Sequence, residues 1–134
     1  TVKPYISFIK KEKKQRNFTP IIIGLEADRE IMYNRINQRV DIMMLNGLLE
    51  EVKPLYQHRN LYPLKTVGYQ ELFANYNEET DLFDNLGFAF EQIKQNTRRF
   101  AKRQMTWFKR TENATWFDFE TDRNEIIKII EKLT

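Results

Sequence analysis

The sequence contains no cysteine, and this absence excludes disulfide bonds, zinc–thiolate sites and thiol nucleophiles. The only histidine, His58, has no carboxylates around it at the spacing of a metal site, so we expect it to be a surface residue. No apolar run approaches the roughly 20 residues of a membrane-spanning helix, and the first residues lack the pattern of a signal peptide. We therefore expect a cytoplasmic protein that has no membrane partner.

Self-sufficient catalytic signatures are also missing. The chain has no GxxxxGK[ST] or GxGxxG phosphate-binding loop, no HExxH zinc motif and no GxSxG nucleophile motif. The sequence therefore offers binding residues, and not a catalytic centre of its own.

Positive charge is present and is concentrated in two places. The 134 residues have a formal net charge of +3, but the basic stretch Lys94–Arg110 alone carries seven Lys and Arg and no acid, which leaves −4 for the rest (+3 less +7). Residues Lys10–Arg16 add five bases against Glu12, which leaves −8 for the remainder (−4 less +4). Such asymmetry is the electrostatic pattern expected of a nucleic-acid-binding protein.

If the basic stretch is helical, its cations form two ridges. Lys94, Arg98 and Lys102 lie four residues apart, and Arg99 and Arg103 form the neighbouring ridge. A charge run is commonly a solvated surface that pairs with nearby acids. Within this stretch, however, no acid lies three or four residues from a cation. We therefore favour phosphate binding over an ordinary charged surface.

Hydrogen-bonding and aromatic residues are interleaved with these cations. Gln104 and Thr106 add polar groups, and Trp107 adds a surface for stacking, although a lone tryptophan can equally belong to a core. This combination favours single-stranded or looped RNA over duplex DNA.

Hydrophobic periodicity predicts a mostly α fold with one or two short strands. The β-branched run Ile21–Leu25 predicts a strand buried on both faces, for which the sequence shows no sheet partner, and a second short strand is expected at 115–119. Helices are predicted at 28–46, 48–56, 67–76 (capped by Thr66), over about 30 residues from Thr80 with Phe100 on the buried face, and after Thr121 or Asp122 with Ile126, Ile127, Ile130 and Leu133 inside. This divides the chain into a connector and core strand at 1–25 and a helical part at 28–134.

Two further sites are candidates for anion binding. Arg35 and Arg39 lie one helical turn apart and form either a guanidinium clamp for a diphosphate or an ordinary surface paired with Asp28, Glu30 or Asp41. Gly68 marks either a simple helix start or a turn whose free backbone N–H groups approach a phosphate.

Three stretches share their order and spacing with one known family. They are DREIMYNRINQRVDIMMLNGLLEEV at 28–52, LKTVGYQELF at 64–73, and IKQNTRRFAKRQMTWFKR at 93–110 followed by TWFD at 115–118. Together they resemble the C-terminal half of the tRNA dimethylallyltransferases, or isopentenylpyrophosphate:tRNA transferases. The resemblance covers nearly the whole chain, and the opening KPYISFIKKEKKQRNFTPIIIGL is similar to the family's return to its core sheet.

The resemblance implies the C-terminal portion of a P-loop-type α/β enzyme that acts as a monomer. Such an enzyme transfers a dimethylallyl group from dimethylallyl diphosphate to N6 of the adenosine 3′ of the anticodon in tRNA, and Mg²⁺ assists the diphosphate leaving group. The target base is flipped out of the anticodon stem-loop, as chemistry on an exocyclic amine requires.

The same resemblance implies which residues make contacts. Arg35 or Arg39 would contact the diphosphate. The implied tRNA contacts are Lys65, Thr66, Val67, Gly68, Tyr69, Gln70, Arg98, Arg99, Lys102, Arg103, Gln104, Thr106, Trp107 and Lys109.

The family's phosphate-binding loop, its general-base Asp and its magnesium ligands have no counterpart in this chain. We therefore expect a fragment that cannot catalyse prenyl transfer alone. Two other functions remain open, namely a non-catalytic RNA-binding module that uses the same basic helix and a helical domain whose basic face meets an acidic protein partner.

Overall fold

The structure, a computed structural model, describes residues 17–133, so the basic cluster Lys10–Arg16 lies outside the described residues. Its elements in chain order are β1 (Ile22–Glu26), α2 (Arg29–Leu45), α3 (Leu48–Leu55), the 3-10 turns η1 (Tyr56–His58) and η2 (Tyr62–Leu64), α4 (Tyr69–Phe73), β2 (Tyr76–Asn77), β3 (Leu82–Phe83), α5 (Leu86–Phe108), β4 (Ala114–Asp118) and α6 (Arg123–Leu133). The mostly helical fold class is confirmed. The described residues hold four short strands where one or two were expected.

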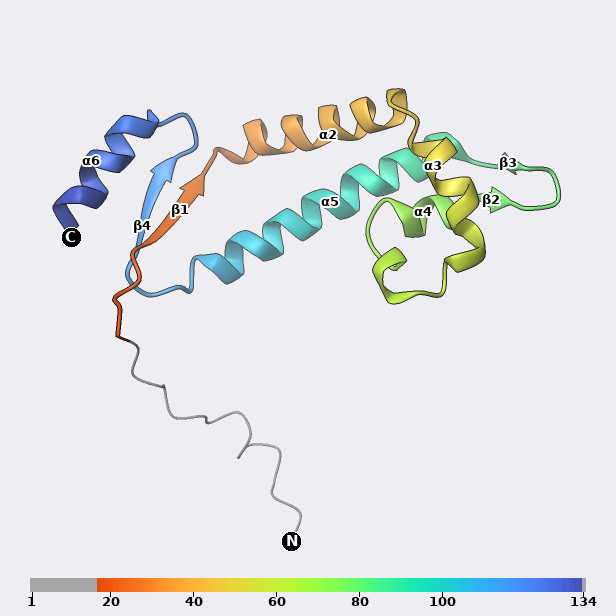
Figure 1. Cartoon of the computed structure of the whole chain (residues 1–134). Helices are drawn as coiled ribbons and strands as arrows, with labels where there is room; N and C mark the ends of the chain where they lie inside the picture. Colours follow the sequence, from red (N-terminus) through yellow and green to blue (C-terminus); the bar gives the residue numbers. More distant parts are fainter. Residues whose placement is uncertain (1–16, 134) are drawn as a thin grey trace, which may run out of the picture.

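The two long helices α2 and α5 run side by side in opposite directions, and the remaining elements lie at their two ends (Figure 1). α2 leads away from β1 over 17 residues, or about 25 Å, whereas α5 returns over 23 residues, or about 35 Å. The return is longer because β4 is parallel to β1. The chain must therefore pass the whole length of β1 before it can enter β4 at Ala114, opposite Ile22.

Local sequence explains where α2 begins and ends. The Asp28 carboxylate accepts a hydrogen bond of 2.8 Å from the Glu30 N–H and caps the helix, as predicted. At the other end Gly47 has φ +91°, a left-handed conformation that a glycine adopts without steric cost. The chain then turns directly into α3, whose Pro54 lies in its last turn.

The hydrophobic core lies at the end of the molecule farther from β1 and β4. It is formed by seven buried side chains from α2, α3, α4 and α5, namely Val40, Leu48, Val52, Leu72, Phe73, Ala89 and Ile93. Leu72, Val52 and Ile93 are the largest of these that are fully buried. This cluster fixes the antiparallel helix pair and the short helix α4 relative to each other.

The expected absence of a sheet partner for the first strand is wrong. β1 pairs in parallel with β4, from Ile22 opposite Ala114 to Glu26 opposite Asp118. Burial on both faces is also wrong, because Leu25 is 54% exposed. A two-stranded parallel sheet has too few neighbours to cover both faces.

Close approach between the strands makes Gly24 sensitive to substitution. A Cβ atom at this position would lie 2.4 Å from Cε3 of Trp116, so we expect Gly24→Ala to destabilise the fold by about 1–3 kcal/mol through overpacking. Urea unfolding followed by tryptophan fluorescence measures this change. Gly87→Ala is the matched control, since nothing lies within 4 Å of its added Cβ, and equal destabilisation by both substitutions would contradict the prediction.

The long helix starts later than predicted. Residues 76–83 form the β2–β3 hairpin, Thr80 lies in its turn, and Asn85 caps α5 through the N–H of Phe88. Asp81 stabilises the hairpin because its carboxylate accepts a hydrogen bond of 2.7 Å from Tyr76 and pairs with Lys53 at 3.1 Å. These contacts lower the pKa of Asp81, the Tyr76 hydrogen bond most strongly.

Three other expectations are corrected, namely the first residue of α4, the residue that caps it and the burial of Phe100. α4 starts at Tyr69 and not at Val67, because Gly68 has φ +104° and cannot belong to a helix, so Gly68 and not Thr66 precedes it. Phe100 is 48% exposed because it lies beyond the core cluster, on the wall of a cavity described below.

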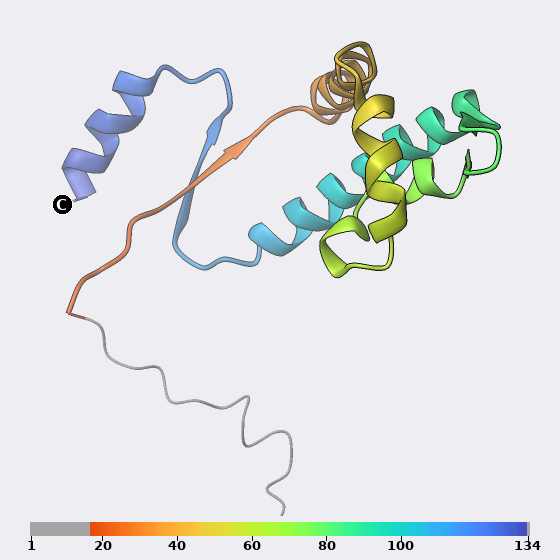
Figure 2. The same cartoon turned by 45° about the vertical axis from the view of Figure 1, so that its right-hand side comes forward.

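The last helix is capped as expected but packs differently. Of the two candidate caps, Asp122 is the one that accepts a hydrogen bond, from the Asn124 N–H at 2.8 Å. α6 stands apart from the helical part of the molecule (Figure 2). Ile127 and Leu133 are exposed, so the expectation that they lie inside is wrong, whereas Ile126 and Ile130 are half-buried.

Candidate nucleic-acid interface

A cavity of about 520 Å³ lies where the three resembling stretches meet. α2 contributes Arg39, the turn before α4 contributes residues 65–68, and α5 contributes Arg103. The complete lining is Ile36, Arg39, Val40, Met43, Lys65, Thr66, Val67, Gly68, Gln70, Ile93, Thr97, Phe100 and Arg103. The cavity thus combines apolar walls with cations from three elements.

Five of the six predicted tRNA contacts at 65–70 line this cavity, and Tyr69 is the exception. The Tyr69 hydroxyl donates a hydrogen bond to the Glu51 carboxylate of α3, which raises the pKa of Tyr69. Tyr69 therefore anchors the turn from behind. The expectation of free backbone N–H groups also needs correction at Gly68, whose N–H donates to Glu71 Oε2 at 2.8 Å.

Lys94 and Arg98, the first two residues of one predicted ridge on α5, face α2. Lys94 Nζ lies 2.8 Å from Asp41 and 3.5 Å from Glu91, and these contacts, the Asp41 hydrogen bond most strongly, raise the pKa of Lys94. Arg98 Nη1 donates a hydrogen bond of 2.6 Å to Asn37 Oδ1. The acids that pair with Lys94 lie on α2 and just before the basic stretch, so Lys94 and Arg98 hold the two helices together.

The rest of the basic stretch is open to solvent. Arg99, Lys102 and Arg103 are exposed, and none of them pairs with a carboxylate in residues 17–133. Arg103 lies over the ring of Phe100 at 5.9 Å. These three cations are therefore available for an anionic ligand, unlike Lys94.

A second hollow, of about 300 Å³, lies further along the same helix. It is lined by Lys102, Arg103, Thr106, Trp107 and Arg110. Trp107 is 66% exposed, so the interpretation in which it fills a core is wrong. An open indole ring among three cations is an arrangement that stacks a base beside its phosphate.

Three further residues of the predicted set lie outside both hollows. Lys109 Nζ pairs with Glu26 at 2.9 Å and lies over the Trp116 ring at 5.9 Å, so it ties the end of α5 to the two-stranded sheet. Gln104 and Arg99 are exposed on α5 but line neither hollow.

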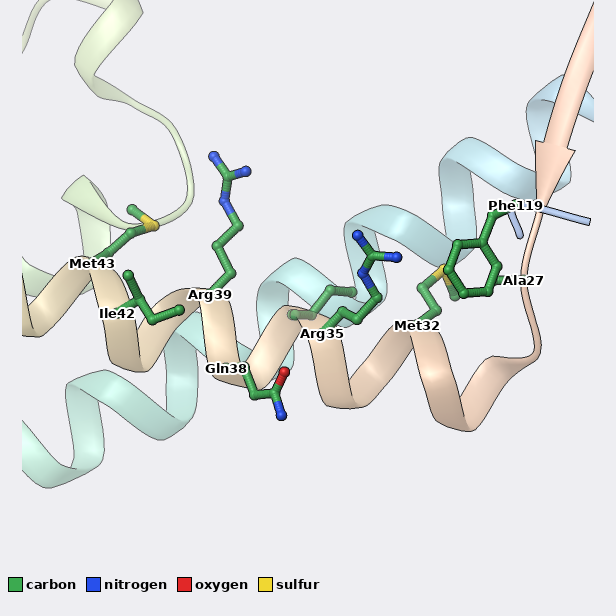
Figure 3. Close-up of a pocket in the computed structure, with 9 residues that line it drawn as sticks. Ala27, Met32, Arg35, Gln38, Arg39, Ile42, Met43 and Phe119 are labelled. Atoms are coloured by element: carbon green, nitrogen blue, oxygen red, sulfur yellow. The ribbon is translucent and has the colours of Figure 1, made fainter. Parts of the chain in front are cut away.

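The two candidate diphosphate-binding arginines point to the same side of α2 (Figure 3). They line a third cavity, of about 680 Å³, in which the Arg35 guanidinium lies 5.0 Å from the centre of the Phe119 ring. Arg39 also lines the cavity that holds the 65–68 turn. The pairing with Asp41 that would make Arg39 an ordinary surface residue is not seen, because Asp41 binds Lys94.

Residues 17–133 offer neither a metal site nor a membrane span. No group of three or more His, Asp or Glu side chains in this region could hold a metal ion. None of the helices in the same region is long and apolar enough to cross a membrane.

Comparison with known proteins decides the family. The family model for IPP transferase matches residues 1–111 of the chain. The chain belongs to the IPP transferase family. A tRNA dimethylallyltransferase of Flavobacterium johnsoniae is 61% identical over 132 residues, which are 98% of this chain and 41% of that protein. The corresponding Bacillus subtilis enzyme is 47% identical over 112 residues, which are 82% of this chain and 34% of that protein.

Solved structures of the IPP transferase family share the fold. The tRNA isopentenylpyrophosphate transferase of Bacillus halodurans is 38% identical, with a TM-score of 0.69 over 84% of this chain and 37% of that one. The Staphylococcus epidermidis enzyme is 35% identical, with a TM-score of 0.73 over 87% of this chain and 40% of that one. The expected family and fold are therefore confirmed, and the chain spans about two fifths of the relatives that it matches.

Several residues of this IPP transferase chain that line the hollows are absent from the predicted contacts, and two of them, Phe100 and Arg110, belong to the basic stretch of α5 and its end. Phe100 continues the apolar face of α5, which predicts a core position, yet it lies one turn before Arg103 and so beside the cationic ridge. Arg110 is the last cation of the basic stretch and lies one turn after Trp107. The signal that could have found both is an aromatic residue within one turn of a cation.

Proposed function

We propose that this chain is the tRNA-binding part of a tRNA dimethylallyltransferase. The observation that carries the proposal is the 520 Å³ cavity at which Arg39, the 65–68 turn and Arg103 converge. The full enzyme would transfer a dimethylallyl group from dimethylallyl diphosphate to N6 of the adenosine 3′ of the anticodon. We expect it to act in the cytoplasm as a monomer, with the tRNA anticodon stem-loop as partner.

The cavity supports this proposal through its two kinds of wall. Val40, Met43 and Ile93 give an apolar floor suited to the flat face of a flipped base, while Arg39, Lys65 and Arg103 supply positive charge for the backbone around it. Further along α5, the hollow around Trp107 would take the neighbouring nucleotides of the loop. The chain's own residues therefore bind and orient the RNA.

The bond-making steps need groups that the described residues do not supply. A Mg²⁺ ion would stabilise the diphosphate as it leaves. Residues 17–133 contain no group of three or more His, Asp or Glu side chains that could hold it, and we propose that its ligands and the P-loop come from the rest of the enzyme. Arg39 is the stronger of the two candidates for contact with the diphosphate, because it lines both the RNA cavity and the cavity that contains Arg35.

A chimera tests the catalytic proposal. The aligned 132 residues of the 61% identical Flavobacterium johnsoniae enzyme are replaced by the corresponding residues of this chain, and prenyl transfer to an anticodon stem-loop is measured by mass spectrometry. We expect the chimera to turn over and the chain alone to be inactive. Turnover by the chain alone, or an inactive chimera that unfolds at the same temperature as its parent, would contradict the proposal.

Salt dependence tests the mode of binding. If Arg39, Lys65, Arg99, Lys102 and Arg103 contact phosphates, log K should fall with log[salt] with a slope of about −3.5, or −0.7 for each of five contacts. Fluorescence anisotropy with a labelled stem-loop measures this slope. An acidic protein that competes fully with the stem-loop, together with a slope near zero, would favour the protein-interaction function instead.

A further inference from the structure

The Glu71 side chain connects two walls of the cavity. Its Oε2 accepts a hydrogen bond of 2.8 Å from the Gly68 N–H, and its Oε1 accepts one of 2.7 Å from Asn96 Nδ2 on α5. Glu71 and Asn96 are 25 residues apart in sequence, and both contacts are partly buried. The carboxylate therefore joins the turn that lines the cavity to the helix that carries the exposed cations.

A helix cap alone does not account for this arrangement. A glutamate in the first turn of α4 satisfies the N–H that precedes the helix with one oxygen only. The second oxygen is used by a side chain of another element, and charge-assisted hydrogen bonds of this kind are stronger than neutral ones. The contact to Asn96 is what fixes the position of the turn relative to α5.

The carboxylate also determines the orientation of the Asn96 amide. Because an ionised carboxylate can only accept hydrogen bonds, Asn96 must present its NH₂ group to Glu71. Its Oδ1 is then turned to Arg99, whose Nη1 lies 3.5 Å away, a long contact that directs the guanidinium without holding it tightly. Gly68 and Asn96 thus both donate to the Glu71 carboxylate, and Arg99 in turn donates to Asn96.

We propose that Glu71 is a positioning residue for RNA binding, which acts through Asn96 to hold the 65–68 turn and the Arg99 guanidinium in fixed relation. This inference rests on the proposed function, because the ligand that needs both groups is the tRNA anticodon stem-loop. Glu71 touches no reacting atom. Its role is to keep the two sides of the cavity at the spacing that the RNA requires.

Glu71→Gln tests the proposal with almost no change in shape. A glutamine that accepts from the Gly68 N–H must present its NH₂ group to Asn96, so the Asn96 amide turns over and directs its own NH₂ group at Arg99. We expect the KM of the chimera for the stem-loop to rise about tenfold, with little change in kcat, because one charge-assisted hydrogen bond is lost and Arg99 is displaced.

Adding Asn96→Asp to Glu71→Gln should reverse this loss. In the double variant the introduced glutamine donates to one oxygen of the introduced aspartate and the other oxygen faces Arg99, while the net charge of the pair is the same as in the parent. Asn96→Asp alone places two carboxylates together and should raise KM as well.

Hydrogen exchange at the Gly68 N–H provides a readout without RNA: exchange should speed up in Glu71→Gln and return toward the parent rate in the double variant.

The outcomes separate this inference from the proposed function. Asn75→Ala is the matched control, because Asn75 donates to the backbone oxygen of Glu71 and leaves its carboxylate alone, so KM should not change.

If Glu71→Gln does not fold, Asn96→Ala removes the hydrogen bond between Asn96 and Glu71 and should raise KM in the same way. An unchanged KM in Glu71→Gln or Asn96→Ala, or a double variant no better than Glu71→Gln, would overturn the inference. An inactive unsubstituted chimera would instead count against the proposed function, and the hydrogen-exchange comparison would still test whether Glu71 and Asn96 fix the 65–68 turn.

Discussion

Leu72→Ala is expected to lower the free energy of unfolding by about 3 kcal/mol. Leu72 is fully buried and lies in α4, a helix of only five residues. So short a helix has almost no stability of its own, because forming its first turn costs more than its few hydrogen bonds return. α4 is held by its contacts with α3 and α5, and Leu72 supplies its most deeply buried side chain.

Urea unfolding followed by circular dichroism measures this loss as a shift in the midpoint. Leu45→Ala is the matched control, since the same atoms are removed from a side chain that is 86% exposed at the end of α2, and we expect a change within about 0.5 kcal/mol. Similar losses for the two variants would mean that the cluster around Leu72 is not the core of the molecule.

Replacement of Arg99 and Arg103 together by alanine is expected to weaken stem-loop binding by about 10- to 100-fold, through the loss of two charge-assisted contacts. The salt slope should also become less steep by about 1.4, or 0.7 for each phosphate contact removed. Both side chains are exposed and form no ion pair in the described part of the chain, so the unfolding midpoint should stay within error of the parent.

Lys128→Ala/Lys132→Ala is the matched control for this double substitution. It removes the same two positive charges from exposed positions on α6, which stands apart from the helices that line the cavity. We expect the control to bind almost as tightly as the parent in anisotropy titrations. An equal loss in both variants would show that RNA responds to net charge only, and that the Arg99 ridge is not the binding surface.

Features that depend on a few consecutive residues were predictable from the sequence. Asp28 and Asp122 cap the helices that they precede, and Gly47 ends α2 with a positive φ, because each of these effects depends on local backbone geometry. The family resemblance named residues 65–70 and Arg103 as tRNA contacts, and all of these except Tyr69 line one cavity, although spacing alone does not show which stretches meet.

Features that depend on distant partners were not predictable in this way. The sequence predicts an unpaired Lys94, because Asp41, the nearer of its two partners, lies 53 positions away on another helix, and Glu91 lies just before the basic stretch. The β1–β4 pairing escapes prediction for the same reason, and so does the contact between Glu71 and Asn96. A helix that starts at Thr80 fits the apolar pattern, but the left-handed φ of +54° at Asp81 ends any helical register there.

The parallel pairing of β1 with β4 also determines the order in which this chain can fold. Ile22 and Ala114 are 92 residues apart, and closing a flexible loop of that length costs about 4 kcal/mol of chain entropy before any strand contact forms. Five residue pairs cannot offset this cost unless α2 and α5 have already associated and brought the strands together. The sheet should therefore form late and be the first part to exchange its amide hydrogens, so a substitution in the helical core should also loosen strands that it does not touch.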